Sequence, residues 1–291
     1  MKKKFSKISR VCALVVIIIS IVPTLAYAVS GEPSKANALF KIDPDIMAIV
    51  VAPLAVVNLA VVTLHATKML GWKPALRMVG VSMAIVYALE EIGVHTGIVF
   101  GRYYFTPFMG PKLDVIPIAI VCGWVVLLYI AWVVTNLLID GSPTPTRHTS
   151  NLIIFRAVVG ALMITTFDLI ADPIGVANGW WVWLDGGSYF GVPIHNYVGW
   201  FIVAFVSYLA HGYQFRREQS PSLELASVGV RRLSIAPLVM YGLSGLAFMF
   251  INFAGQLGLI TFYLFGIPFL IAAWKWIVWY KRAPKVTTPQ T

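Results

Sequence analysis

Long apolar stretches separated by short polar segments make up most of this chain. Each stretch is close to the roughly 20 residues that an α-helix needs to cross a bilayer. We therefore predict an all-α, polytopic transmembrane helical bundle of about eight spans. The predicted spans are Val11–Val29, Ile46–Ala66, Leu76–Val99, Val115–Ile139, Leu152–Ile174, Ile194–Tyr213, Ile235–Ala254 and Leu257–Tyr280.

The first stretch has two interpretations. A basic leader, an apolar run and Ala26-Tyr27-Ala28 describe a signal peptide with its cleavage site as well as a membrane span. If the leader is cleaved, seven spans remain and the later topology is unchanged. In both cases we expect residues 1–30 to be a separate N-terminal segment, residues 31–282 one membrane bundle, and residues 283–291 a polar tail.

The composition agrees with a membrane protein, since only 12% of the 291 residues are charged and 59% are hydrophobic. Soluble domains carry about 25% charged residues. The net charge of +10 would suit nucleic acid, but its distribution argues otherwise. With the N-terminus inside, all but four basic residues fall at or near the inner side, which is the positive-inside pattern. We therefore predict a multi-pass protein of the cell membrane with a cytoplasmic C-terminus and no nucleic-acid partner. The four outer basic residues are Lys35, Lys41, Arg102 and Lys112.

Four carboxylates interrupt two of the predicted spans, namely Glu90 and Glu91 in one and Asp168 and Asp172 in another. A charged group inside a span costs several kcal/mol, so it marks a functional site by default. Glu91 and His95 are four residues apart and share a helix face, as do the two aspartates. Both spans run outward in the predicted topology, which places all four carboxylates toward the outer side.

Neighbouring carboxylates in a low dielectric repel each other when both are ionised. We therefore predict that at least one of Asp168 and Asp172, and one of Glu90 and Glu91, carries a proton near neutral pH. A protonated buried carboxylic acid is a competent general acid. The alternative is that these groups only hydrogen-bond the helices to one another or to Arg102.

Other polar and aromatic residues fall at the same outer level. Asn196 opens the next span, and the loops before it are rich in aromatic residues, which form either an anchoring belt or the wall of a binding site. Gly93, Gly97 and Gly101 recur every four residues, so we expect them to line one helix face, for close packing or for a flat lipid-soluble ligand. Pro173 is expected to end its helix at Asp172. The loop aromatics are Tyr103, Tyr104, Trp180, Trp181, Trp183 and Tyr189.

Three functions could use these features. Asp168-x-x-x-Asp172 could hold Mg²⁺ and a diphosphate in a membrane prenyltransferase. Lys275 in the last span could form the Schiff base of a retinal protein, although it lies near the inner end and can snorkel. A transporter or proton relay would need polar residues along the whole path. The inner halves of the spans look apolar, and His65 and His211 are expected at the inner interface.

Four blocks of residues together resemble a known family. They are Glu90-Glu91-Ile92-Gly93-x-x-Thr96-Gly97-x-x-Phe100-Gly101-x-Tyr103-Tyr104, Asp168-x-x-x-Asp172-Pro173, Gly179-Trp180-Trp181-x-Trp183 and Tyr189-Phe190-Gly191-Val192-Pro193-x-x-Asn196-Tyr197-x-Gly199-Trp200. In this order and spacing they resemble the integral-membrane carotenoid 1,2-hydratases. That resemblance implies addition of water to the terminal double bond of an acyclic carotenoid, such as a lycopene-like, γ-carotene-like or C50 bacterioruberin precursor.

The resemblance leaves the catalytic roles open, so we assign them from the chemistry. Protonation of the end-group alkene at C2 gives a tertiary carbocation at C1, which water captures. Asp168 and Asp172 are the predicted acid–base pair, with Glu90, Glu91 and His95 as a second base or water-positioning group. Asn196 could hold the water. The six loop aromatics would surround the cation, and Gly93 and Gly97 would border the polyene.

This chemistry needs no cofactor and no metal ion. The predicted partners are a lipid-soluble carotenoid, the lipid bilayer and neighbouring enzymes of carotenoid biosynthesis.

The charge distribution generates a topology prediction. Reporter fusions at Thr291 should report a cytoplasmic C-terminus, and fusions at Gly187 should report an outer position for the loop that follows the tryptophans. A translocated C-terminus would contradict the predicted topology and move the carboxylates to the inner side.

Overall fold

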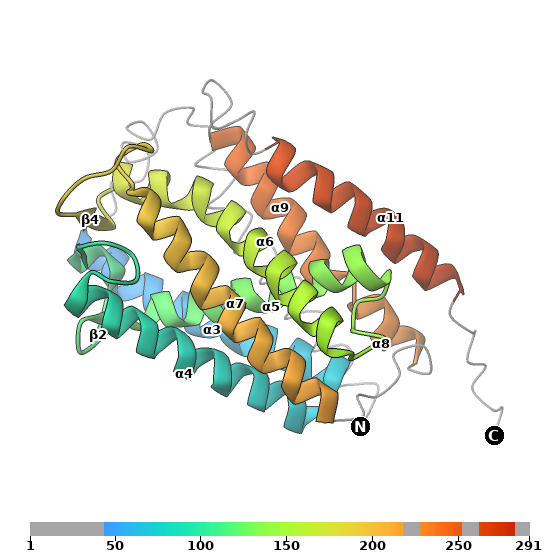
Figure 1. Ribbon diagram of the computed structural model, residues 1–291. Helices are drawn as coiled ribbons and strands as arrows, with labels where there is room; N and C mark the ends of the chain where they lie inside the picture. Colours follow the sequence, from blue (N-terminus) through green and yellow to red (C-terminus); the bar gives the residue numbers. More distant parts are fainter. Residues whose placement is uncertain (1–43, 218–226, 252–261, 283–291) are drawn as a thin grey trace.

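The computed structural model of the protein describes residues 44–217, 227–251 and 262–282. The predicted first span with its cleavage site, and the polar tail, lie outside the described residues. Figure 1 shows the long helices packed side by side in one bundle, as the apolar stretches predict. The helices are α3 (Pro44–Leu70), α4 (Trp72–Thr96), α5 (Ile118–Asp140), α6 (Ser150–Ala177), α7 (Ile194–Arg217), α8 (Val228–Leu233), α9 (Ala236–Ile251), the π-helical turn η3 (Phe262–Gly266) and α11 (Ile267–Arg282).

The all-α bundle is confirmed, but the predicted number of spans is not. Within the described residues, four helical segments are long and apolar enough to cross a membrane: Ile49–Leu70, Ile118–Asp140, Ser150–Ala177 and Val228–Met249. The helices α4 and α7 have comparable lengths of 25 and 24 residues but carry more polar side chains. The last helix, α11, has only 16 residues because η3 precedes it.

Helix α5 is the centre of the bundle. Most of its residues from Ala119 to Leu137 are buried, and it contacts α3, α4, α6, α9 and α11. A helix that is apolar on all sides is stable in this position, because every face meets another helix or lipid. Helix α6 makes its most extensive contact with α7, which lies antiparallel to it.

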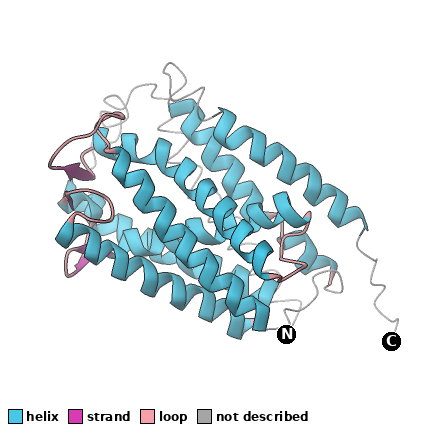
Figure 2. Ribbon diagram, in the orientation of Figure 1, coloured by secondary structure: helices cyan, strands magenta, loops and turns pink. Residues whose placement is uncertain are grey.

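Short strands gather at one end of the bundle (Figure 2). Strand β1 (Tyr103–Phe105) pairs with β4 (Trp181–Trp183) in an antiparallel arrangement. Between β1 and α5 the chain forms a 3-10 turn, η1 (Pro107–Met109), and a second pair, β2 (Lys112–Leu113) with β3 (Ile116–Pro117). The β1–β4 pair therefore joins the loop after α4 to the loop after α6.

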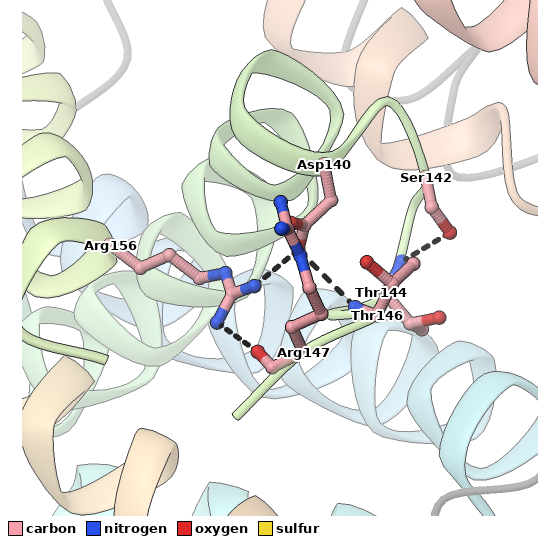
Figure 3. Close-up of polar contacts among 6 residues, drawn as sticks. All are labelled: Asp140, Ser142, Thr144, Thr146, Arg147 and Arg156. Carbon is pink, nitrogen blue, oxygen red and sulfur yellow. Dashed lines mark hydrogen bonds and ion pairs between the residues drawn. The ribbon is translucent and has the colours of Figure 1, made fainter. Parts of the chain in front are cut away.

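The opposite end of the bundle is held by a buried ion pair (Figure 3). The Arg156 guanidinium donates to Asp140 Oδ2 at 2.5 Å and to the Arg147 carbonyl at 2.8 Å. The Thr146 amide also donates to Asp140 Oδ2, at 3.3 Å. These contacts fasten the end of α5 to the start of α6.

Other polar residues in this half of the bundle are buried between helices. His211 is fully buried, its Nε2 lies 2.9 Å from Ser82 Oγ, and it is not one of the residues that contact Asp168 or Asp172. Asn136 is also fully buried, so the expectation that this half of the bundle is apolar is wrong. The His211–Ser82 contact joins α7 to α4, as expected of polar side chains that pack helices together. Lys275 donates to the Leu138 carbonyl at 2.5 Å and ties α11 to the end of α5.

The Arg156–Asp140 pair generates a stability prediction. Arg156→Met should destabilise the bundle by roughly 3–5 kcal/mol, because it leaves the Asp140 charge buried without its partner. The matched control is Arg216→Met at the same end, where the guanidinium is exposed and bonded to Ser150; the loss there should be about 1 kcal/mol or less. Thermal unfolding in detergent measures both. Equal midpoints for the two variants would contradict the structural role of the buried pair.

Candidate active site

Two aspartates on α6 share one amide on α7. The Asn196 Nδ2 group lies 2.8 Å from Asp168 Oδ2 and 2.5 Å from Asp172 Oδ2. All three side chains are buried, with exposed fractions of 0%, 3% and 1% for Asp168, Asp172 and Asn196. The four-residue spacing places both carboxyl groups on the α6 face that meets α7. The sequence prediction that these residues come together is therefore matched by the geometry.

Glu90 on α4 is the third buried carboxyl group, with an exposed fraction of 4%. It accepts a hydrogen bond from the Tyr103 hydroxyl at 2.5 Å and another from Trp124 Nε1 at 2.8 Å. It also lies close enough to Asp168 and Asp172 to interact electrostatically with both. Helices α4 and α6 thus bring three carboxyl groups to one buried place, which we call the carboxyl cluster (Glu90, Asp168 and Asp172).

Aromatic rings from the β1–β4 pair lie beside the carboxyl cluster. The register sets Tyr103 opposite Trp183 and Phe105 opposite Trp181. The first pair is stacked with ring centroids 5.7 Å apart, and the second meets edge to face at 6.4 Å. Because Tyr103 also donates to Glu90, this aromatic wall (Tyr103, Phe105, Trp181 and Trp183) is joined directly to the cluster.

The position of the aromatic wall depends on a glycine of α6 against which it packs. A Cβ atom at Gly175 would lie 2.1 Å from the Trp181 ring, so the indole rests directly on the α6 backbone. Helix α6 continues past Pro173 to Ala177, and the expectation that it ends at Asp172 is wrong. Packing of this last buried turn against Trp181 outweighs the local preference of a residue before proline.

The remaining predicted aromatics are placed less deeply. Tyr104 points away from the wall and is 47% exposed. Trp180 is half-buried and meets Trp181 edge to face at 5.8 Å. Tyr189 is half-buried, and its ring meets the ring of Tyr197 at 5.5 Å.

The predicted glycine face does not exist. Helix α4 ends at Thr96, so Gly97 and Gly101 belong to the following turn, with φ of 71° and 90°. This turn carries Phe100 back onto Gly93, where a Cβ atom would lie 2.6 Å from the ring. The regular spacing failed as a guide because residues four apart share a face only while the helix continues.

Glu91 and His95 are separate from the carboxyl cluster. His95 Nε2 lies 3.1 Å from Glu91 Oε2 and 3.2 Å from Asp114 Oδ2, at the exposed end of α4. These three residues could offer ligand atoms to a cation, since the atoms lie within 4.8 Å of one another. Two of the three are exposed, and such groups are common on protein surfaces without an ion.

The two basic residues at this end are engaged elsewhere. Arg102 forms an ion pair with Asp185, which holds the pKa of that carboxyl group below its usual range. Lys112 donates to the Phe105 carbonyl at 2.7 Å. Within the described part of the chain, neither residue makes a hydrogen bond or an ion pair to the carboxyl cluster. The alternative that Arg102 pairs with these carboxylates is therefore wrong.

Sequence reasoning missed three residues of this site. Trp124 binds Glu90 and stacks on Trp200 with centroids 3.9 Å apart. Tyr197 is buried beside Asn196. Tyr197 and Trp200 lie in the last of the four blocks quoted above and could have been found there. Trp124 lies inside an apolar span, where nothing in the sequence distinguishes it from a packing residue.

Known proteins similar to this chain belong to carotenoid biosynthesis. A family model described as "Carotenoid biosynthesis protein" matches residues 50–274, which include the whole carboxyl cluster and the aromatic wall. A bisanhydrobacterioruberin hydratase from Haloarcula japonica is 28% identical over 132 residues, which are 45% of this chain and 42% of that protein. The alignment therefore spans less than half of that relative. No solved structure matches the chain.

The contact between Gly175 and Trp181 generates a prediction. Gly175→Ala should lower the thermal midpoint in detergent, because the added methyl group overlaps the indole and overpacking costs about 1–3 kcal/mol. Gly123→Ala is the matched control, since a Cβ atom at this α5 position meets nothing within 4 Å. That substitution should be neutral or stabilising. A Gly175→Ala protein as stable as the control would contradict the close approach.

Proposed function

Because this chain belongs to the carotenoid biosynthesis protein family, we propose that it is a carotenoid hydratase. It adds water to the terminal 1,2 double bond of an acyclic end group and produces a tertiary alcohol. The observation that supports this most is the buried carboxyl cluster next to an aromatic wall. A reaction that begins with proton transfer to an alkene needs an acid shielded from water and a surface that tolerates a cation.

The acid in this proposal is the Asp168–Asp172 pair. The two carboxyl groups lie within hydrogen-bonding reach of each other and of the same Asn196 amide. Such a pair is most stable with one shared proton, because two ionised carboxylates at this separation repel each other. The shared proton is transferred to C2, and a carbocation forms at C1.

The same pair completes the reaction. Water forms a bond to C1 through its oxygen, and its surplus proton passes to the carboxylate that was left behind. One molecule of water is added, and the pair regains its proton. Asn196 keeps both carboxyl groups in place through each step, so its role is positioning rather than holding the water.

Glu90 has a different role in this proposal. Both of its oxygens accept hydrogen bonds, from Tyr103 and from Trp124, and carboxylates that receive such bonds are stabilised in the ionised form. An ionised Glu90 beside the cation lowers the energy of the intermediate. The rings of Tyr103 and Trp183 add their negative faces to the same effect.

The substrate is proposed to be a lycopene-like, γ-carotene-like or C50 polyene that enters from the bilayer. Basic residues gather at the end of the bundle opposite the carboxyl cluster, so we place the cluster on the outer side and the C-terminus in the cytoplasm. The prenyltransferase alternative is weaker with this geometry. Asp168 and Asp172 are bonded to Asn196, and Arg102 and Lys112 are engaged elsewhere, whereas a Mg²⁺–diphosphate site needs carboxylates free to bind the metal and cations free to bind the diphosphate.

Expression in a host that accumulates lycopene or bisanhydrobacterioruberin tests the proposal. Mass spectrometry of the pigments should show a gain of one water for each modified end. In ¹⁸O-labelled water each new hydroxyl should carry the heavy isotope. A gain of prenyl mass, or a hydroxyl whose oxygen comes from O₂, would contradict a hydratase.

Substitutions at the three carboxyl groups of the cluster and at Glu91 should separate their roles. Asp168→Asn and Asp172→Asn should lower hydration by at least about 100-fold, because an amide cannot donate the proton. Glu90→Gln should also impair hydration severely. Glu91→Gln is the matched neighbour outside the cluster and should retain most activity. All four proteins should accumulate in the membrane, as measured by immunoblotting. Hydration at the wild-type rate in both aspartate variants would rule out this acid.

A further inference from the structure

Two buried polar atoms, one in the carboxyl cluster and one on Tyr197, have no hydrogen-bond partner among the described residues. The Tyr197 hydroxyl and Asp168 Oδ1 are buried, and neither makes a hydrogen bond to any described residue. A buried polar group without a hydrogen-bond partner destabilises the folded protein. Such atoms in a polar pocket commonly mark the place of an ordered water or a ligand.

Tyr197 is held in a defined position. It follows Asn196 on the first turn of α7 and is only 6% exposed. Its ring meets the ring of Tyr189 edge to face, at a centroid distance of 5.5 Å and an interplanar angle of 89°. It is also close enough to Asp168 and Asp172 to interact with both electrostatically.

Asn196 has no N–H donor left for the reacting water. A side-chain amide has two N–H donors. Its nitrogen already bonds to Asp168 and to Asp172, so both donors are used. Tyr197 is the next residue, and its hydroxyl is not engaged by any described residue.

We propose that Tyr197 is a further catalytic residue that holds the water which captures the carbocation, together with Asp168. This inference rests on the proposed hydratase function. The water donates one hydrogen to Asp168 Oδ1 and the other to the Tyr197 oxygen, which leaves a lone pair free to face C1. When the bond to C1 forms, the proton moves to the aspartate pair and Tyr197 keeps its own proton.

This assignment separates two steps that share one site. Proton transfer to C2 needs the aspartate pair but not Tyr197. A carbocation that meets no positioned water returns a proton to the pair, either from C2 or from a methyl group on C1. It then leaves as the original polyene or as an isomeric alkene with the same mass.

Deuterium labelling distinguishes the two steps. Membranes that contain the full chain are incubated in D₂O with lycopene or bisanhydrobacterioruberin, whichever the wild-type protein hydrates. Tyr197→Phe should lower the hydrated product about tenfold, the value of one good hydrogen bond. The polyene that is recovered without added water should still gain deuterium. Among all deuterium-labelled molecules, the unhydrated fraction should be larger with Tyr197→Phe than with the wild type. Asp168→Asn should remove both the hydrated product and the deuterium.

The matched control is Tyr208→Phe, at a buried tyrosine on the same helix whose hydroxyl donates to the Leu128 carbonyl at 2.9 Å. It should hydrate at the wild-type rate with the wild-type distribution of label. Tyr197→Phe with unchanged hydration would overturn the assignment. A parallel loss of hydration and deuterium uptake would also overturn it, since it would place Tyr197 in proton transfer or in folding. A wild-type protein that adds no water to either polyene would instead refute the hydratase function itself.

Discussion

Burial of three carboxyl groups in an apolar helical bundle is the constraint on which this structure depends. A carboxylate without partners inside a protein is too costly to maintain, so each group must be hydrogen-bonded or protonated. Glu90 receives donors from β1 and α5, and the two aspartates receive one from α7. The partners come from three segments, and the carboxyl groups themselves come from α4 and α6. Satisfying the carboxyl groups therefore fixes how α4, α5, α6 and α7 meet at this end.

The aromatic hairpin follows from the same requirement. The pairing of β1 with β4 holds the strand that carries Tyr103 to Glu90, and the packing of Trp181 on Gly175 holds β4 against α6. The polar cluster and the apolar wall are therefore parts of one arrangement. Closing this end with stacked rings shields the carboxyl groups from bulk solvent and strengthens the electrostatic interactions between them.

Part of this arrangement could be predicted from the sequence. The apolar stretches predict the helical bundle, and the four-residue spacing predicts that Asp168 and Asp172 share one helix face. Glu90 and Glu91 could not be separated in the same way, because adjacent helical residues point about 100° apart and only packing decides which one is buried. Trp124 was missed because an indole in a span is as suited to packing as to donating a hydrogen bond. The glycine spacing misled because the end of α4 is set by the turn at Gly97 rather than by periodicity.

The hydrogen bonds also explain why two kinds of carboxyl group can share one site in the proposed reaction. Glu90 has a donor for each oxygen, whereas the two aspartates share a single amide and lie within reach of each other. A group with two donors is stabilised when ionised, and a crowded pair is stabilised when it shares a proton. In the proposed reaction, the number of hydrogen-bond donors therefore determines the role of each carboxyl group. The aspartate pair supplies the proton, and Glu90 supplies the negative charge that stabilises the cation. The two roles do not require different functional groups. They require only different numbers of hydrogen-bond donors from the surrounding segments.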